Sequence, residues 1–265
     1  MTNPAGRLLD IYDSQLRTDA EMQGALRVGR LGPLYLAVFP GGQGFITSPR
    51  FTGGEPAPLS ALVGPALEYF TARSGITEVE FKTRGHDHAP GLHEALLSCG
   101  FSAGQPESVM LGRLEHLISG LPAPQGVQVR RISTPLEVEQ MCAMSAEAFG
   151  QPPSPGLARE LAARMDLANG LELWVAWAGA RMVGAGRLEP VAGTEVVGLW
   201  GGGVLPAYRG RGIYRALTDA RAWSARAAGH IFAHSDSTEY SRPILERQGM
   251  VKVTTTTPYT WKRSG

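Results

Sequence analysis

The feature that most constrains this chain is a basic, glycine-rich turn that stands between a strand pattern and a helix pattern. An apolar run, Val196–Val204, leads into the turn Arg209–Gly212, and helical spacing begins at Ile213. The first amides of a helix have no partner within it, and the helix dipole adds positive character at that end. Glycine lets the backbone approach an anion closely, while Arg209 and Arg211 add fixed charge. This order predicts a loop that binds phosphate.

The kind of phosphate ligand follows from which glycines are present. A dinucleotide fingerprint requires a third glycine where Arg215 stands, and a P-loop requires a Gly-Lys-Ser/Thr triplet that the sequence lacks. The loop instead resembles the pyrophosphate loop of the GNAT superfamily of acyl-CoA N-acyltransferases, through Val204, Pro206, Tyr208, Arg209 and Gly212. Tyr214 replaces the small residue that usually ends this pattern. Two rival interpretations are a nucleotide-binding protein that uses the loop for ATP or NAD, and a turn that only connects strand and helix.

Periodicity in the second half gives an order of elements that resembles the GNAT fold. Strands are predicted at residues 127–132, 173–177, 182–188, 196–204, 230–234 and 251–261, and helices from 134, at 156–167, after 212 and at 241–248. Thr134, Pro135 and Glu137 form a helix-start pattern. The helix after the loop carries a stripe that we expect to face the sheet: Ile213, Ala216, Leu217, Ala220, Trp223 and Ala227.

The two halves of the chain share a spacing that indicates an internal duplication. Three pairs have an offset of 149 residues: Asp87 and Asp236, Leu96 and Leu245, and Gly100 and Gly249. A chance match is the alternative, because glycine after a helix is common. The resemblance implies an α/β (α+β) protein with two GNAT-like domains, each a mixed, mostly antiparallel sheet flanked by helices. We place the boundary at the Pro/Gly-rich segment 120–126, so that residues 1–120 form a degenerate copy and residues 127–265 form the acetyltransferase domain.

The first half lacks the phosphate loop at the corresponding place. Residues 52–56 contain no arginine, and Glu55 would repel a phosphate. The sequence therefore predicts one acyl-CoA site per chain, with the first half shaping the acceptor pocket.

The resemblance implies acetyl-CoA as co-substrate. Residues 201–203 are glycines that suit a strand bulge. Gly203, Val204 and Leu205 would then line the pantetheine arm, and the amide of Val204 or Leu205 would lie near the thioester oxygen. The diphosphate would be held by the amides of Arg209, Gly210, Arg211, Gly212, Ile213 and Tyr214. Thr238 and Ser241 complete the cofactor-binding candidates.

The catalytic groups cannot be carried over directly. Family members often have a tyrosine four residues before the glycine that ends the last helix, but Leu245 stands there, and Thr238 replaces the usual asparagine. Tyr214 and Tyr240 are the candidate catalytic residues by proximity, with Ser241 as a further substitute. A base is needed to deliver a neutral amine. Among the ionisable residues near strand ends we prefer Glu195, the others being Glu189, His234 and Asp236.

Composition narrows the class of partner. The net charge is +1, so we expect neither a nucleic-acid nor a membrane partner, and we expect a cytoplasmic protein because no leader or spanning run is evident. Cys99 and Cys142 are expected to be small buried hydrophobes. The cluster His86, Asp87, His88 and His93 is expected to form a solvated loop rather than a metal site.

These observations lead to one functional expectation and one alternative. The chain is expected to be an N-acetyltransferase that passes an acetyl group from acetyl-CoA directly to a primary amine of a small molecule or peptide in a ternary complex. No Gly-x-Ser-x-Gly nucleophile motif is present. The alternative is a non-catalytic acyl-CoA-binding or regulatory protein. We expect a monomer or a homodimer.

Overall fold

The chain divides into two compact units in the computed structural model, which describes residues 4–55, 57–165, 167 and 170–263. The first unit comprises Met1–Val109, Asp236–Glu239 and Lys252–Gly265, and the second comprises Met110–Ser235 and Tyr240–Val251. The Pro/Gly-rich segment 120–126 therefore lies within the second unit. The division of the chain at this segment into two repeated domains stays a prediction.

The first unit is built on a mixed sheet. Its strands lie in the order β1 (Arg27–Leu31), β2 (Leu34–Phe39), β3 (Gln43–Thr47), β4 (Glu78–Arg84) and β12 (Val251–Lys262), with β5 (Ser102–Ala103) beside β12. Its helices are α1 (Pro4–Ile11), α2 (Val63–Thr71) and α3 (Leu92–Ser98). Neighbouring strands are antiparallel except β3 and β4, which are parallel and joined through α2.

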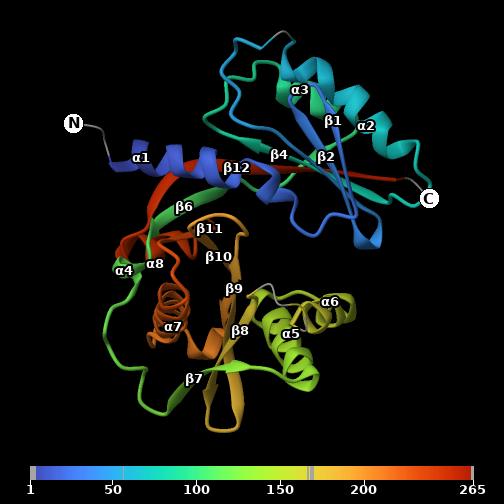
Figure 1. The fold of residues 1–265 in the computed structure, drawn as a ribbon. Helices are drawn as coiled ribbons and strands as arrows, with labels where there is room; N and C mark the ends of the chain where they lie inside the picture. Colours follow the sequence, from blue (N-terminus) through green and yellow to red (C-terminus); the bar gives the residue numbers. More distant parts are fainter. Residues whose placement is uncertain (1–3, 56, 166, 168–169, 264–265) are drawn as a thin grey trace. The chain divides into compact units, whose positions relative to one another are not determined.

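One strand of this sheet comes from the end of the chain. We expected residues 251–261 to form the last strand, and this strand, β12, pairs with β4 from Thr256 opposite Arg84 to Lys262 opposite Glu78. In Figure 1 the red strand β12 accordingly runs beside the teal strand β4. Alternation along a strand indicates which face is buried but does not specify the neighbouring strand. The strand itself was predicted, whereas the sequence indicated no neighbour for it.

The second unit contains the phosphate-loop candidate. Its strands are β7 (Val127–Ile132), β8 (Glu172–Ala178), β9 (Arg181–Pro190), β10 (Val196–Val204) and β11 (Phe232–Ser237), and β6 (Glu107–Arg113) spans the division between the units. Its helices are α4 (Leu114–Leu117), α5 (Pro135–Phe149), α6 (Pro155–Met165), α7 (Ile213–Ala227) and α8 (Arg242–Arg247). Strands β7 to β10 are antiparallel in chain order, and β10 and β11 are parallel. Helices α5 and α6 cover one face of this sheet and α7 covers the other (Figure 1).

Both units thus have the predicted class of fold, a mixed and mostly antiparallel sheet flanked by helices. Each unit contains one parallel crossover, β3–α2–β4 in the first and β10–α7–β11 in the second. Gly100 and Gly249, which are related by the sequence offset, each follow a short helix, and each glycine has a positive φ. None of the helices in the described part of the chain is both long and apolar enough to span a bilayer.

Local signals set the helix that begins at residue 135. The hydroxyl of Thr134 accepts from the amide of Glu137 at 3.3 Å and donates to the Glu137 carboxylate at 3.0 Å. Pro135 occupies the first turn, where its missing N–H costs nothing. Gly150 ends the helix with a φ of 65°. The predicted start of α5 therefore matches the structure.

The buried face of α7 differs from the predicted stripe. Trp223 is 63% exposed, and the residues buried in its place include Thr218 and Arg221. The Arg221 guanidinium donates to the carbonyls of Arg187 and Leu217, both at 3.1 Å. Ile213, Ala216 and Leu217 are buried as predicted. A hydrogen-bonded arginine can also be buried, so a stripe drawn from apolar residues alone misplaced the second half of the helix face.

Candidate functional site

Strand β10 carries a bulge beside the loop. Trp200 lies opposite Arg187 on β9, but the next registered pair is Gly203 with Ala185, so the register shifts between them. Gly201 has a φ of 57°, which favours glycine. Side chains would also collide here, because a Cβ on Gly202 would lie 2.9 Å from the ring of Tyr214. The predicted glycine bulge is therefore present, and Tyr214 packs against it.

The backbone pairing of strands β10 and β11 ends just before this bulge. Their parallel pairing covers only three positions and ends with Gly198 opposite His234. The next link is a side chain, since the Ser235 hydroxyl donates to the carbonyl of Leu199 at 2.9 Å. The Trp200 ring meets the His234 ring edge-on, with centroids 5.2 Å apart. Beyond this point the edge of β10 that faces β11 is unpaired among the described residues.

The register settles which amide faces this open edge. The amide of Leu205 donates to the carbonyl of Val183 on β9 at 2.9 Å. In an antiparallel pair, successive amides point to opposite edges of the strand. The amide of Val204 therefore points away from β9, and of the two amides considered from the sequence only that of Val204 is available to a ligand.

The loop after β10 presents further amides. Gly210 and Gly212 have φ values of 74° and 80°, and Gly212 caps α7 without a side-chain bond. The amide of Arg209 donates to Pro206 at 3.2 Å, so this member of the predicted set is already bonded. Within the described residues, the amides of Gly210, Arg211 and Gly212 have no acceptor. Together with the first helical amides of α7, they form a concave set of donors.

The two loop arginines have different roles. The Arg209 guanidinium donates to the carbonyl of Val204 at 3.1 Å and to that of Ala148 at 2.8 Å, which ties the loop to β10 and α5. Arg211 is exposed, donates to Ala207 at 3.0 Å and lies over the Tyr208 ring at 5.0 Å. Arg211 is thus the arginine that can add charge to a bound anion, whereas Arg209 braces the loop.

Tyr214 is the one predicted catalytic residue that lies at the bulge. Its hydroxyl lies 3.2 Å from the position that a Cβ on Gly202 would take. Burial raises the pKa of the Tyr214 phenol, and the nearby charge of Arg221 only partly opposes this effect. A phenol with a raised pKa stays protonated at neutral pH and can donate a proton.

The other predicted catalytic residues are not brought to this point. Glu195 is exposed and immediately precedes β10, and the six-position offset from it to Gly201 corresponds to about 20 Å of strand. Tyr240 is 91% exposed and has no hydrogen-bond partner among the described residues. Leu245, which stands where the family often has tyrosine, is 1% exposed in an apolar cluster.

The remaining candidates lie elsewhere or serve other contacts. Thr238 and Asp236 fall in the segment that groups with the first unit, where Asp236 pairs with Lys82 at 2.7 Å. Ser241 precedes α8, and its carbonyl accepts from Ile244 at 3.0 Å. Glu189 pairs with arginines on α6 and β9. These residues therefore do not form one cluster around the loop.

Sequence reasoning missed a cavity on the α5–α6 face of the bulge. It has a volume of about 230 Å³ and is lined by Met141, Cys142, Ser145, Ala146, Phe149, Gln151, Pro152, Ser154, Leu157, Leu161, Gly186, Arg187 and Gly201. The lining combines three separated segments, so no local pattern marks it. Cys142 is buried as predicted, whereas Cys99 is only partly buried.

The first unit lacks an open counterpart of the loop. The Glu55 carboxylate accepts from the amides of Thr52 and Gly53, each at 2.8 Å. These bonds, that from the Thr52 amide foremost, hold the pKa of Glu55 below its usual value. An internal carboxylate thus takes the amides that a ligand anion would need. Pro56 lies outside the described residues.

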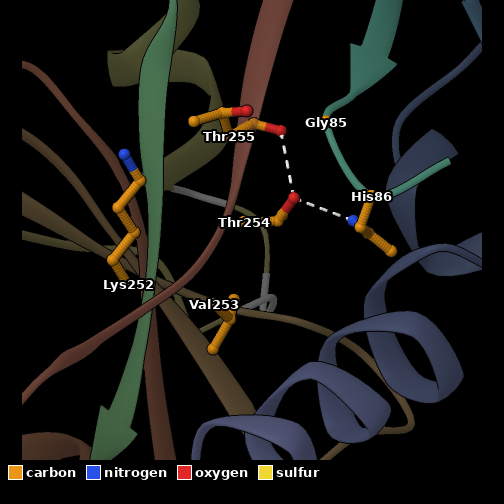
Figure 2. Close-up of a pocket in the computed structure, with 6 residues that line it drawn as sticks. All are labelled: Gly85, His86, Lys252, Val253, Thr254 and Thr255. Atoms are coloured by element: carbon orange, nitrogen blue, oxygen red, sulfur yellow. Dashed lines mark hydrogen bonds between the residues drawn. The ribbon is translucent and has the colours of Figure 1, made fainter.

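The histidine-containing segment that was predicted to be a solvated loop makes hydrogen bonds and an ion pair through His86 and Asp87. His86 lines a hollow of about 360 Å³ in the first unit, together with Gly85 and residues 252–255 (Figure 2). Its Nδ1 lies 2.8 Å from the Thr254 hydroxyl and its Nε2 lies 3.0 Å from Asp13. Asp87 pairs with Arg17 at 2.8 Å, and both side chains are almost fully buried. No group of metal-ligating side chains occurs among the residues that the structure describes.

A splayed strand, a glycine loop with unbonded amides and a helix N-terminus define a class of sites that bind a phosphate-bearing substrate beside an open strand edge. Residues 138–250 match the family model described as "Acetyltransferase (GNAT) family". This match covers less than half of the chain and agrees with the resemblance seen in the sequence.

Solved structures show the same fold over the whole chain. A GCN5-related N-acetyltransferase from Kribbella flavida is 17% identical, with a TM-score of 0.67, and the match covers 100% of this chain and 98% of that one. A GCN5-related N-acetyltransferase from Sphaerobacter thermophilus is 19% identical, with a TM-score of 0.64 and coverages of 100% and 95%. A tandem GNAT protein from the clavulanic acid biosynthesis pathway is 14% identical, with a TM-score of 0.63 and coverages of 98% and 96%. A comparison with functionally curated proteins gave no match.

Proposed function

We propose that the second unit transfers an acetyl group from acetyl-CoA to a primary amine by direct attack within a ternary complex. The observation that carries this proposal is the coincidence of the bulge at residues 200–203, the end of β10–β11 pairing at Gly198 and the unbonded amides from Gly210 onward. Each of these features serves a different part of the same ligand, and all three lie along one edge of β10.

The described residues fit such a ligand. The amides of Gly210, Arg211 and Gly212 supply donors for a diphosphate, and exposed Arg211 adds charge. A Cβ on Gly203 would lie 3.1 Å from the Phe149 ring, so glycine at this position lets Phe149 of α5 pack directly against the strand. The outward amide of Val204 would donate to the thioester oxygen and stabilise the charge that develops on it.

Tyr214 supplies the proton that the reaction needs at sulfur. As the amine nitrogen attacks, a C–N bond forms and the C–S bond breaks, leaving a thiolate. The partly buried phenol of Tyr214 donates its proton to that sulfur, and the proton released by the nitrogen returns to the phenol through water. Protonation of the leaving group and fixed alignment of the reactants are the two contributions that this chain makes.

One feature favours a second candidate function. Leu245 is a buried apolar residue at the position where the family often has its acidic tyrosine. A protein that binds acyl-CoA without turning it over is therefore the alternative, and it requires that Tyr214 does not act as an acid.

Steady-state turnover separates the two candidates. Free thiol release from acetyl-CoA would be followed with a panel of amines, and coenzyme binding would be measured by calorimetry on the same preparations. We expect turnover by the wild type and a loss of roughly 10²- to 10⁴-fold in kcat for Tyr214→Phe with coenzyme affinity retained. Binding without turnover of any amine would establish the non-catalytic alternative.

A further inference from the structure

The cavity on the α5–α6 face lies directly against the bulge. Gly201 and Gly186 belong to its lining, and a Cβ on Gly201 would lie 3.7 Å from the Nε of Arg187. A molecule in this cavity would therefore meet β10 at the bulge, three residues before the Val204 amide at which the thioester oxygen is proposed to lie. Because this placement depends on that thioester, the inference below rests on the proposed function.

Arg187 is the one charged residue in the described part of this lining. Its Nε lies 3.2 Å from Glu189, yet the geometry is not that of a hydrogen bond, and this buried atom has no other partner. The two terminal nitrogens of the guanidinium also have no acceptor in the described part of the chain. The Glu189 carboxylate is shared with Arg164 on α6, at 2.5 Å.

Free guanidinium donors at the wall of a cavity fit a carboxylate. A guanidinium binds a carboxylate through two parallel charge-assisted hydrogen bonds. Arg187 is only 24% exposed, so the bond would be partly shielded from water. Arg164 is drawn toward Glu189 and toward exposed Glu160, at 3.6 Å, which leaves Arg187 as the cation that a ligand in the cavity would meet.

The rest of the wall is largely apolar. Met141, Phe149, Leu157 and Leu161 supply hydrocarbon or aromatic surface on the two helices, while Ser145, Gln151 and Ser154 are small or neutral polar groups. Among the described residues, no acidic side chain lines the cavity, and the carboxylate that pairs with Arg187, that of Glu189, lies outside the lining. A volume of about 230 Å³ is below the range of pockets that enclose drug-sized ligands, which is roughly 300–1,000 Å³.

The geometry points to the acceptor: we propose that this cavity binds a free α-amino acid with an apolar side chain and presents its amine to the thioester. Arg187 abuts the bulge, so a carboxylate bound to it lies close to the reacting carbon. Only an amine on the α-carbon, next to that carboxylate, stays equally close to the reacting carbon of the thioester. An amine at the end of a long chain would be carried away from the bulge, toward α6.

The test compares acceptors that differ only in the carboxylate. Turnover with acetyl-CoA would be measured for leucine and for isoamylamine, which is leucine without its carboxylate, using wild type and Arg187→Met. Arg226→Met provides a matched control, because Arg226 is an exposed arginine at the end of α7, away from the cavity. Coenzyme affinity of each variant, measured by calorimetry, shows whether the fold and the loop are intact.

We expect the wild type to prefer leucine over isoamylamine in kcat/KM. Arg187→Met should lower kcat/KM for leucine by roughly 10- to 100-fold, the value of one or more hydrogen bonds to a charged group, and should leave isoamylamine and coenzyme affinity nearly unchanged. Equal loss with both acceptors, or wild-type turnover of amines without preference for the acid, would overturn the inference while the acetyltransferase proposal stands. Failure to acetylate any amine would overturn both.

Discussion

Substitution of Gly202 by alanine probes the contact on which the catalytic proposal depends. The new Cβ would lie 2.9 Å from Cε2 and 3.2 Å from the hydroxyl of Tyr214, whereas carbon atoms pack best at about 3.5–4.0 Å. The ring or the bulge must therefore move by roughly 0.5–1 Å. Overpacking of this kind costs about 1–3 kcal/mol of stability. A displacement of this size at a reacting group can lower kcat by as much as ~10²-fold.

Urea unfolding and steady-state turnover would measure both effects of Gly202→Ala. Gly64→Ala is the matched control, because no atom lies within 4 Å of its Cβ position and it lies within α2. That control should be neutral or more stable by about 0.5–1 kcal/mol. If Gly202→Ala retained both wild-type stability and wild-type kcat, Tyr214 would not lie against the bulge and could not act as proposed.

Two further predictions concern the first unit. Burial opposes ionisation of Glu21, but the charges of Arg84 and Lys82 outweigh it and lower the pKa of this carboxyl. A group whose pKa is lower in the folded state stabilises the fold fully above its unfolded pKa of 4.5, and this stabilisation is lost as the pH falls through the lower folded pKa. The free energy of unfolding, measured from about pH 2 to 7, should therefore rise with pH across that window. Glu21→Gln should flatten the rise. Glu55→Gln should leave kcat and the ratio of one coenzyme per chain unchanged in calorimetry, since Glu55 faces no substrate; binding of a second coenzyme would show that the first half holds a latent site.

Local sequence signals predicted the parts of the fold that are formed locally. Strands β7 and β10 begin and end where the alternating and apolar runs do, and the Thr134 cap fixes the start of α5. The loop was predicted for the same reason, because a strand, two glycines and a helix start are adjacent in the chain. Arg209 could not be distinguished from Arg211 in this way, since its acceptor on Ala148 is distant in the sequence.

Features that depend on distant segments were missed or misplaced. The partner of β12 and the buried face of α7 depend on which surfaces meet, and neither follows from periodicity. Glu195 was chosen because it is near a strand end, but the loop follows β10 whereas Glu195 precedes it, so chain order alone argued against it. The cavity around Arg187 combines residues from two helices and two strands, which no linear pattern could have joined.

The central claim is that the backbone amides from Gly210 to Tyr214 hold the diphosphate of coenzyme A. A crystal structure of the chain with acetyl-CoA tests it most directly. Diphosphate oxygens within hydrogen-bond distance of these amides, with the thioester oxygen at the amide of Val204, are the predicted result. Coenzyme density at any other place in the chain, with the loop amides facing only solvent, would contradict the account.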